Sequence, residues 1–160
     1  MKKLKVGFFS FTGCEGCVIV FLELMNANYK KWVELMDFRY IRILKSENRI
    51  DDLDIAFIEG AISNYKEEEM IKEIRKNCKK LVAIGSCACN GTPSNQRNFF
   101  DEETRGEIQI ILDRFGHREK VSPISEIVPV DDFIPGCPMS EDVFLQKLNQ
   151  YFVEFGVVDA

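Results

Sequence analysis

The amino-acid sequence predicts an α/β fold: a parallel sheet with helices on both faces, in a single domain. Short apolar runs alternate with longer segments of helical periodicity, which is the pattern of repeated strand–helix–strand units. The first of these runs is apolar on both sides, as strands are when helices cover both faces of a sheet. The length of 160 residues suits one domain, and the chain contains no internal repeat or linker. We therefore expect one domain spanning residues 1–160.

The expected strands differ in how deeply they should be buried. Residues 5–11, 55–60 and 81–84 are apolar enough for central strands. Residues 38–44 alternate apolar and basic side chains, which suits a strand nearer the sheet edge. Residues 124–130 form a weaker candidate, because Pro129 cannot donate a backbone hydrogen bond and so favours an edge strand.

Four segments have the apolar periodicity of helices that pack on a sheet. They cover residues 18–35, the stretch after Ser63 or Asn64, residues 102–115 and the stretch after Ser140. The second carries acidic residues first and basic residues last, the order that complements a helix dipole. Asp101 and Gly116 stand where the third helix needs its N-terminal and C-terminal caps.

Composition narrows the classes of function. A net charge of −5 disfavours nucleic acid as a partner, because phosphate binding needs a basic face. No apolar run approaches the roughly 20 residues that cross a bilayer, and the first run meets Cys14 too soon for a signal peptide. We expect a cytoplasmic protein without a membrane span. In a reducing cytosol, its six cysteines are metal ligands or reactive thiols rather than disulfides.

Four of the six cysteines follow predicted strands. Cys14 and Cys17 come after the first strand, Cys87 after the fourth and Cys137 after the fifth. The carboxyl ends of parallel strands meet at one edge of the sheet, where such folds build their sites. We therefore expect these four thiols to converge, although they lie far apart in the sequence.

Three kinds of site can use such thiols. An iron–sulfur cluster takes four thiolates, and the glycines and prolines beside these cysteines would let the backbone turn around bulky sulfide. A structural zinc also takes four thiolates, but usually from two Cys-x-x-Cys pairs. A thiol–disulfide site needs only Cys14 and Cys17. Of the remaining cysteines, Cys78 is expected to be a small buried hydrophobe, and Cys89 is a candidate substitute ligand for Cys87.

The motifs resemble those of a known family, the small subunit of nickel–iron hydrogenases of the cytoplasmic, NAD(P)-linked type. The matching motifs are Cys14-Glu15-Gly16-Cys17, Asp54 to Gly60, Gly85-Ser86-Cys87-Ala88 and Ile134 to Pro138. The related 20 kDa subunit of complex I typically has two adjacent cysteines in the first motif. Here Glu15 and Gly16 separate them, which favours the hydrogenase branch.

The resemblance implies a flavodoxin-like domain in which Cys14, Cys17, Cys87 and Cys137 hold one [4Fe-4S] cluster. It implies electron transfer between a large subunit with the nickel–iron site and iron–sulfur or flavin subunits that serve NAD(P)(H) or ferredoxin. No residue of this chain is then expected to be catalytic. A complex I-like subunit without hydrogen chemistry and a stand-alone dithiol protein are the alternatives.

Several other side chains carry weaker expectations. Glu15 and Glu59 could assist proton movement, although hydrogen-bonding or surface roles are commoner for such carboxylates. Phe99, Phe100 and Phe133 lie close to the cysteines in the predicted fold, and we expect them to face a partner.

Overall fold

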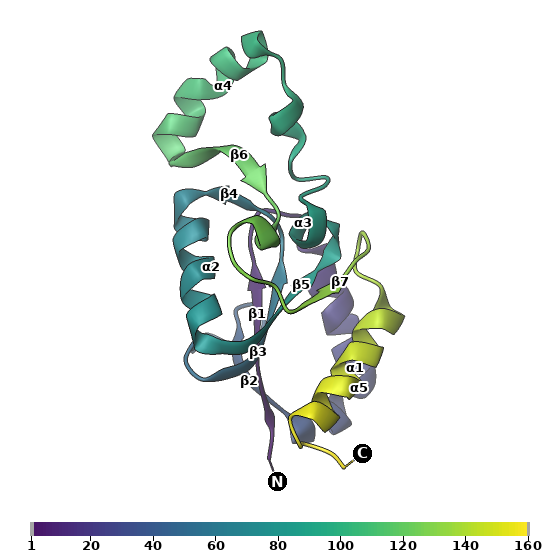
Figure 1. Ribbon diagram of the computed structural model, residues 1–160. Helices are drawn as coiled ribbons and strands as arrows, with labels where there is room; N and C mark the ends of the chain where they lie inside the picture. Colours follow the sequence, from purple (N-terminus) through teal and green to yellow (C-terminus); the bar gives the residue numbers. More distant parts are fainter. Residues whose placement is uncertain (1, 160) are drawn as a thin grey trace.

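A computed structural model describes residues 2–159, and a five-stranded parallel sheet forms its centre (Figure 1). The strands are β1 (Leu4–Ser10), β2 (Met36–Ile41), β3 (Leu53–Glu59), β5 (Cys78–Ile84) and β7 (Asp132–Ile134). Their order is β2-β1-β3-β5-β7, and every neighbouring pair is parallel. This is the flavodoxin-like order, in which the first strand lies between the second and third. The predicted α/β fold is confirmed.

Helices cover both faces of the sheet (Figure 1). On one face, α1 (Gly16–Leu35) and α5 (Glu141–Glu154) pack on alternate side chains of the strands. On the other face, α2 (Tyr65–Asn77) packs on the side chains between them. The short α3 (Gly85–Asn90) follows β5 directly, and α4 (Glu102–Phe115) lies beyond the carboxyl ends of the strands.

Stacked aromatic rings hold α1 to the sheet. The Phe8 ring of β1 lies 3.8 Å from the Phe21 ring of α1 and 4.7 Å from the Phe57 ring of β3, measured between centroids. Phe144 of α5 closes the group at 5.3 Å from Phe57. Each fully buried phenylalanine contributes roughly 1.5–3 kcal/mol by leaving water. These contacts fix α1, and therefore its first turn, relative to the strand ends.

Local capping signals set the helix ends as predicted. The Asn64 side chain accepts a hydrogen bond from the Glu67 amide at 2.9 Å, and Asp101 accepts one from the Thr104 amide at 2.8 Å. Gly116 ends α4 in the left-handed region at φ 65°, a conformation that glycine adopts without strain.

The prediction of a strand at residues 124–130 is wrong. Residues Ile124–Glu126 form a 3-10 helix, and the edge strand is β7, eight residues further on. The apolar residues of this stretch that are most buried are Ile124 and Val128, a helical spacing of four. That spacing lets one turn bury both side chains against the α2 face of the sheet.

A small antiparallel pair, β4 (Ile62–Asn64) with β6 (His117–Ser122), was not anticipated from the sequence. The Asn98 side chain holds β6 by accepting from the Val121 amide and donating to the Val121 carbonyl, both at 2.8 Å. His117 is the first residue of β6, and its Nδ1 lies 3.3 Å from the Ser63 carbonyl. No helix among residues 2–159 combines the length and apolar character needed to cross a membrane.

Candidate metal centre

The four predicted cysteines lie at the carboxyl end of the sheet. Cys14 is in the loop between β1 and α1, Cys17 in the first turn of α1, Cys87 in α3, and Cys137 between β7 and α5. We call these four residues the cysteine rim. Cys17 is buried, Cys87 is half-buried, and Cys14 and Cys137 are exposed.

Backbone contacts draw three of these segments together around Cys17. A Cβ atom built on Gly85 would lie 2.3 Å from the Cys17 sulfur and 3.7 Å from the Gly136 carbonyl oxygen. The next amide, that of Ser86, donates to the same carbonyl at 2.7 Å. The start of α3 therefore lies against both Cys17 and the turn that carries Cys137.

The same turn also meets the loop of Cys14. A Cβ atom built on Gly16 would lie 3.3 Å from the Cys14 sulfur and 3.8 Å from the Pro138 Cβ atom. Pro138 is the direct neighbour of Cys137, so the first and last cysteines are on adjoining loops. The predicted convergence of the four segments is therefore present.

Two hydrogen bonds end on cysteine sulfurs. The Met139 amide donates to the Cys17 sulfur at 3.4 Å, and the Ser94 hydroxyl donates to the Cys87 sulfur at 3.2 Å. Donors of this kind stabilise thiolate charge and tune a bound metal centre. Neither donor was identified from the sequence, because nothing in the local pattern around Ser94 or Met139 marks them.

The donor set and its spacing distinguish the candidate groups. Among residues 2–159, no three His, Cys, Asp or Glu side chains lie close enough to share one metal ion. A tetrahedral zinc would need its four sulfurs about 3.8 Å apart. A 4Fe-4S cluster places each thiolate on a different iron and so keeps the sulfurs further apart. Only Cys14 and Cys17 form a Cys-x-x-Cys pair, whereas structural zinc sites usually use two such pairs.

Glu59, the last residue of β3, holds the start of α1. The residue is 3% exposed, and its carboxylate accepts from the Cys17 amide at 3.3 Å and the Val18 amide at 2.9 Å. Burial raises the pKa of Glu59, against the lowering effect of these two hydrogen bonds. The helix has no side-chain cap of its own at Glu15, so Glu59 supplies one from a neighbouring strand. Glu59 therefore acts as a buried hydrogen-bond acceptor. Glu15, the other carboxylate considered from the sequence, is exposed.

The buried environment of Cys17 favours its protonated thiol. Burial raises the pKa of its thiol to about 12, and the nearby Glu59, Cys14 and Cys87 add to the rise. A reactive Cys-x-x-Cys site instead needs a thiol of lowered pKa at a helix start. Of this pair, Cys17 is therefore not the attacking thiol of a thiol–disulfide site, and that role would fall to the exposed Cys14.

The two remaining cysteines belong to the apolar layer under α2. Cys78 is buried at the start of β5, as expected, and its sulfur lies 3.8 Å from the Arg75 carbonyl. Cys89 packs against the same layer, and its thiol donates to the Ala83 carbonyl at 3.5 Å. Burial raises the pKa of both thiols to about 11. Cys89 is thus directed into the protein, which does not favour a role as substitute ligand.

Hydrogen bonds between β7 and α5 support the turn of Cys137 on both sides. Asp132 accepts from the Lys147 ammonium at 2.6 Å and from the Tyr151 hydroxyl at 2.8 Å. Burial alone would raise the pKa of Asp132, but these hydrogen bonds outweigh it and lower the pKa. Because β7 precedes and α5 follows the Pro135–Ser140 turn, these hydrogen bonds limit how far Cys137 can move.

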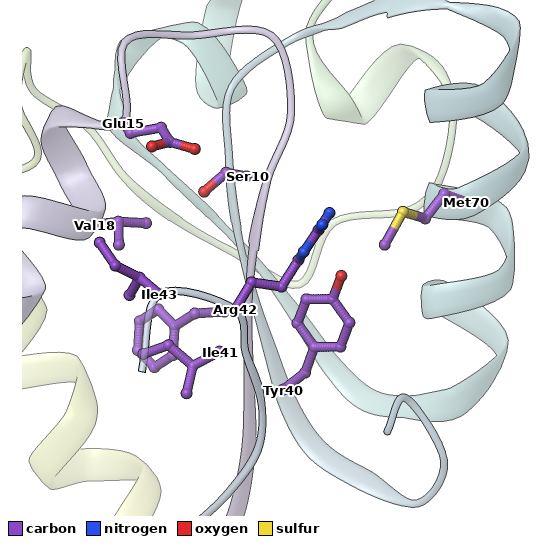
Figure 2. Close-up of a pocket in the computed structure, with 9 residues that line it drawn as sticks. Ser10, Glu15, Val18, Tyr40, Ile41, Arg42, Ile43 and Met70 are labelled. Carbon is purple, nitrogen blue, oxygen red and sulfur yellow. The ribbon is translucent and has the colours of Figure 1, made fainter. Parts of the chain in front are cut away.

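A pocket of about 350 Å³ lies beside the loop of Cys14 (Figure 2). In Figure 2, Glu15 and Ser10 lie on one side of it, and Arg42 lies beside Tyr40 on the other. Its further lining residues are Phe8, Val18, Ile41, Ile43 and Met70. The outer side of this loop is therefore open to a side chain or a small molecule from outside the chain.

Comparisons with known proteins find one family and a set of relatives that agree with one another. The family described as NADH ubiquinone oxidoreductase, 20 Kd subunit, matches residues 14–151. The gamma subunit of coenzyme F420 hydrogenase from Methanosarcina barkeri is 32% identical over 144 residues, covering 89% of this chain and 51% of the relative. The delta subunit of the NAD-reducing hydrogenase HoxS from Cupriavidus necator is 26% identical, and the match covers 92% of this chain and 78% of the relative.

Among solved structures, a chain of an NAD+-reducing NiFe-hydrogenase in the H2-reduced state superposes with a TM-score of 0.82. It is 32% identical, and the match covers 96% of this chain and 93% of that one. The chain spans about half the length of the first curated relatives it matches. The family match covers most of the chain, and this hydrogenase chain matches over nearly its whole length. The protein therefore belongs to the family of the NADH ubiquinone oxidoreductase 20 kDa subunit, together with subunits of nickel–iron hydrogenases.

Proposed function

We propose that this protein is the electron-transfer small subunit of a cytoplasmic nickel–iron hydrogenase. In this proposal residues 1–160 form one iron–sulfur domain, and Cys14, Cys17, Cys87 and Cys137 hold one 4Fe-4S cluster. The single observation that carries the proposal is the meeting of four thiol-bearing segments at the carboxyl end of the sheet. The relatives named as hydrogenase subunits support the choice of enzyme.

The residues of this chain would prepare the site rather than react. When bound, the cluster would supply the ability to take up and release one electron at a time. Glu59 fixes the backbone of Cys17, and the Met139 amide donates to its sulfur. The Ser94 hydroxyl does the same for Cys87. With these groups already in place, little rearrangement would accompany a change of charge at the site.

Two kinds of partner follow from this proposal. A large subunit would hold the nickel–iron site and handle hydrogen. Iron–sulfur or flavin subunits would pass the electrons to or from NAD(P)(H) or ferredoxin. The exposed side of the cysteine rim, at Cys14 and Cys137, is where the first of these partners would approach.

A second candidate is a subunit of a complex I-like oxidoreductase without hydrogen chemistry, which the family match to the 20 kDa subunit favours. The two candidates share the cluster and differ in the large subunit. Nickel in the co-purified large subunit would identify the hydrogenase, whereas a large subunit without nickel would favour the second candidate.

Anaerobic purification of the intact complex tests the proposal. We expect a brown protein with about four irons in this subunit. The variants Cys87→Ser and Cys137→Ser should lose the cluster, and the matched control Cys78→Ser should keep it. A colourless protein that reacts with thiol reagents, or a full complement of iron in both rim variants, would show that the ligand assignment is wrong.

A further inference from the structure

The helix α4 leaves large apolar side chains in solvent. Leu112 is its only buried residue, and the helix packs within the chain against β6. Ile110, Ile111 and Phe115 are 75%, 51% and 64% exposed. We call these three residues the α4 patch. Ile111 and Phe115 lie four residues apart and therefore share one face of the helix. Grouped exposed side chains of this kind mark interaction sites on folded proteins.

Three arginine hydrogen bonds attach the base of α4 to the rest of the domain. The Arg97 guanidinium donates to the Ser63 and Arg118 carbonyls, both at 2.8 Å. The Arg105 guanidinium in turn donates to the Asn98 carbonyl at 2.8 Å. A surface held in place in this way loses little freedom when a partner covers it.

The helix α4 is also continuous with the cysteine rim. The Ser94 hydroxyl lies 3.2 Å from the Cys87 sulfur and 3.1 Å from the Thr12 carbonyl in the loop of Cys14, so its one proton is shared between these two acceptors. A 3-10 helix, Gln96–Phe99, follows at once, and its last residue, Phe99, is 79% exposed. Figure 1 shows α4 beyond the same end of the sheet as α3. A partner that covers Cys14 and Cys137 and extends past Phe99 would therefore meet α4 as well.

The charge around the patch indicates the chemistry of that partner. Residues 101–115 carry five acidic and two basic side chains, a net charge of −3. Two copies of this segment would repel each other, which disfavours pairing through a second copy of the chain. An apolar groove bordered by lysine and arginine would complement both the patch and its surroundings.

We propose that the α4 patch is a docking element for the large subunit that covers the cysteine rim, and that it binds an apolar, basic-edged groove there. This inference rests on the proposed function. The cysteine rim sets where electrons would cross, and α4, which hydrogen bonds attach to the same end of the domain, fixes the orientation of the partner. The patch holds no cluster ligand, so it can be changed without touching the site.

The test compares two double variants that each remove two exposed apolar side chains. Ile111→Gln with Phe115→Gln alters the patch. Tyr29→Gln with Val153→Gln is the matched control, since these residues are exposed on α1 and α5. Glutamine is a good helix former and preserves both helices. Each chain is purified anaerobically with its cluster and titrated against the nickel-containing large subunit that co-purifies with the wild type.

We expect the patch variant to keep its iron content and to bind the large subunit at least tenfold more weakly. The control should stay within twofold of the wild type. Equal binding by the patch variant would overturn the inference and leave the proposed function intact. If the wild type binds no nickel-containing subunit, the proposed function itself fails. A wild-type dimer that becomes a monomer in the patch variant, measured by light scattering, would assign the patch to self-association instead.

Discussion

Replacing Gly85 with alanine should displace the Cys17 thiol. Gly85 has φ +78°, and a Cβ atom there would lie 2.3 Å from the Cys17 sulfur. Carbon and sulfur atoms do not approach so closely without a bond, so one of them has to move. The Cys17 amide donates to the Glu59 carboxylate and the Met139 amide donates to the Cys17 sulfur, which leaves little room for this residue to give way.

Two terms set the size of the effect. An L-residue in the left-handed region costs roughly 1–2 kcal/mol relative to glycine. Forcing an extra carbon into a filled site costs typically about 1–3 kcal/mol more. The variant should therefore lose roughly 2–5 kcal/mol of unfolding free energy.

Gly116→Ala separates the two terms. Gly116 has φ +65° and nothing within 4 Å of the Cβ position, so alanine there carries the backbone cost alone. Urea unfolding of the anaerobically purified chains should show a larger loss of unfolding free energy for Gly85→Ala, and only this variant should have a reduced iron content. Equal stability losses with full iron in both variants would refute the crowding of Cys17 by Gly85.

Three further predictions test other parts of the chain. Gly106→Ala should stabilise the exposed helix α4 by up to about 1 kcal/mol, seen as a higher thermal midpoint, because no atom lies within 4 Å of the Cβ position. Asp132→Asn removes the ion pair with Lys147 and should cost about 1–2 kcal/mol at neutral pH. The lowered pKa of Asp132 means that this contribution is present above 3.8 and lost as the pH falls further, so urea unfolding of wild type and variant should converge in acid. Ser94→Ala removes the donor to the Cys87 sulfur and should make the potential of a bound cluster more negative, by up to about 40 mV in a redox titration; an unchanged potential would show that this hydroxyl does not reach the site.

Features set by neighbouring residues were predictable from the sequence. The caps at Asn64, Asp101 and Ser140 depend on side chains that bond three residues ahead, and all three are present. The buried strands were predictable because apolar runs leave few alternatives in a chain of this length. The meeting of the cysteine-bearing segments was predictable from strand direction, since parallel strands end at one edge, although the strand before Cys137 is β7 and not residues 124–130.

Features set by distant contacts were not predictable. Strand β6 has the sequence His-Arg-Glu-Lys-Val-Ser, with no apolar alternation, and depends on β4 and on the Asn98 side chain from another segment. The two sulfur hydrogen bonds, from Ser94 and Met139, likewise join residues whose meeting depends on the complete fold. The capping role of Glu59 joins β3 to α1 across 41 residues, so no local pattern could assign it.

The unequal exposure of the cysteine rim gives the proposed site a direction. Cys17 is buried beneath the turn of Met139, whereas Cys14 and Cys137 are exposed. A cluster held by all four thiols would therefore be covered by the sheet on its inner side and open on its outer side. Electrons would cross on the open side, because only there could another redox centre approach. The helix α4 lies beyond that same end of the sheet (Figure 1), so docking through its patch and electron transfer through the rim would require one and the same partner surface.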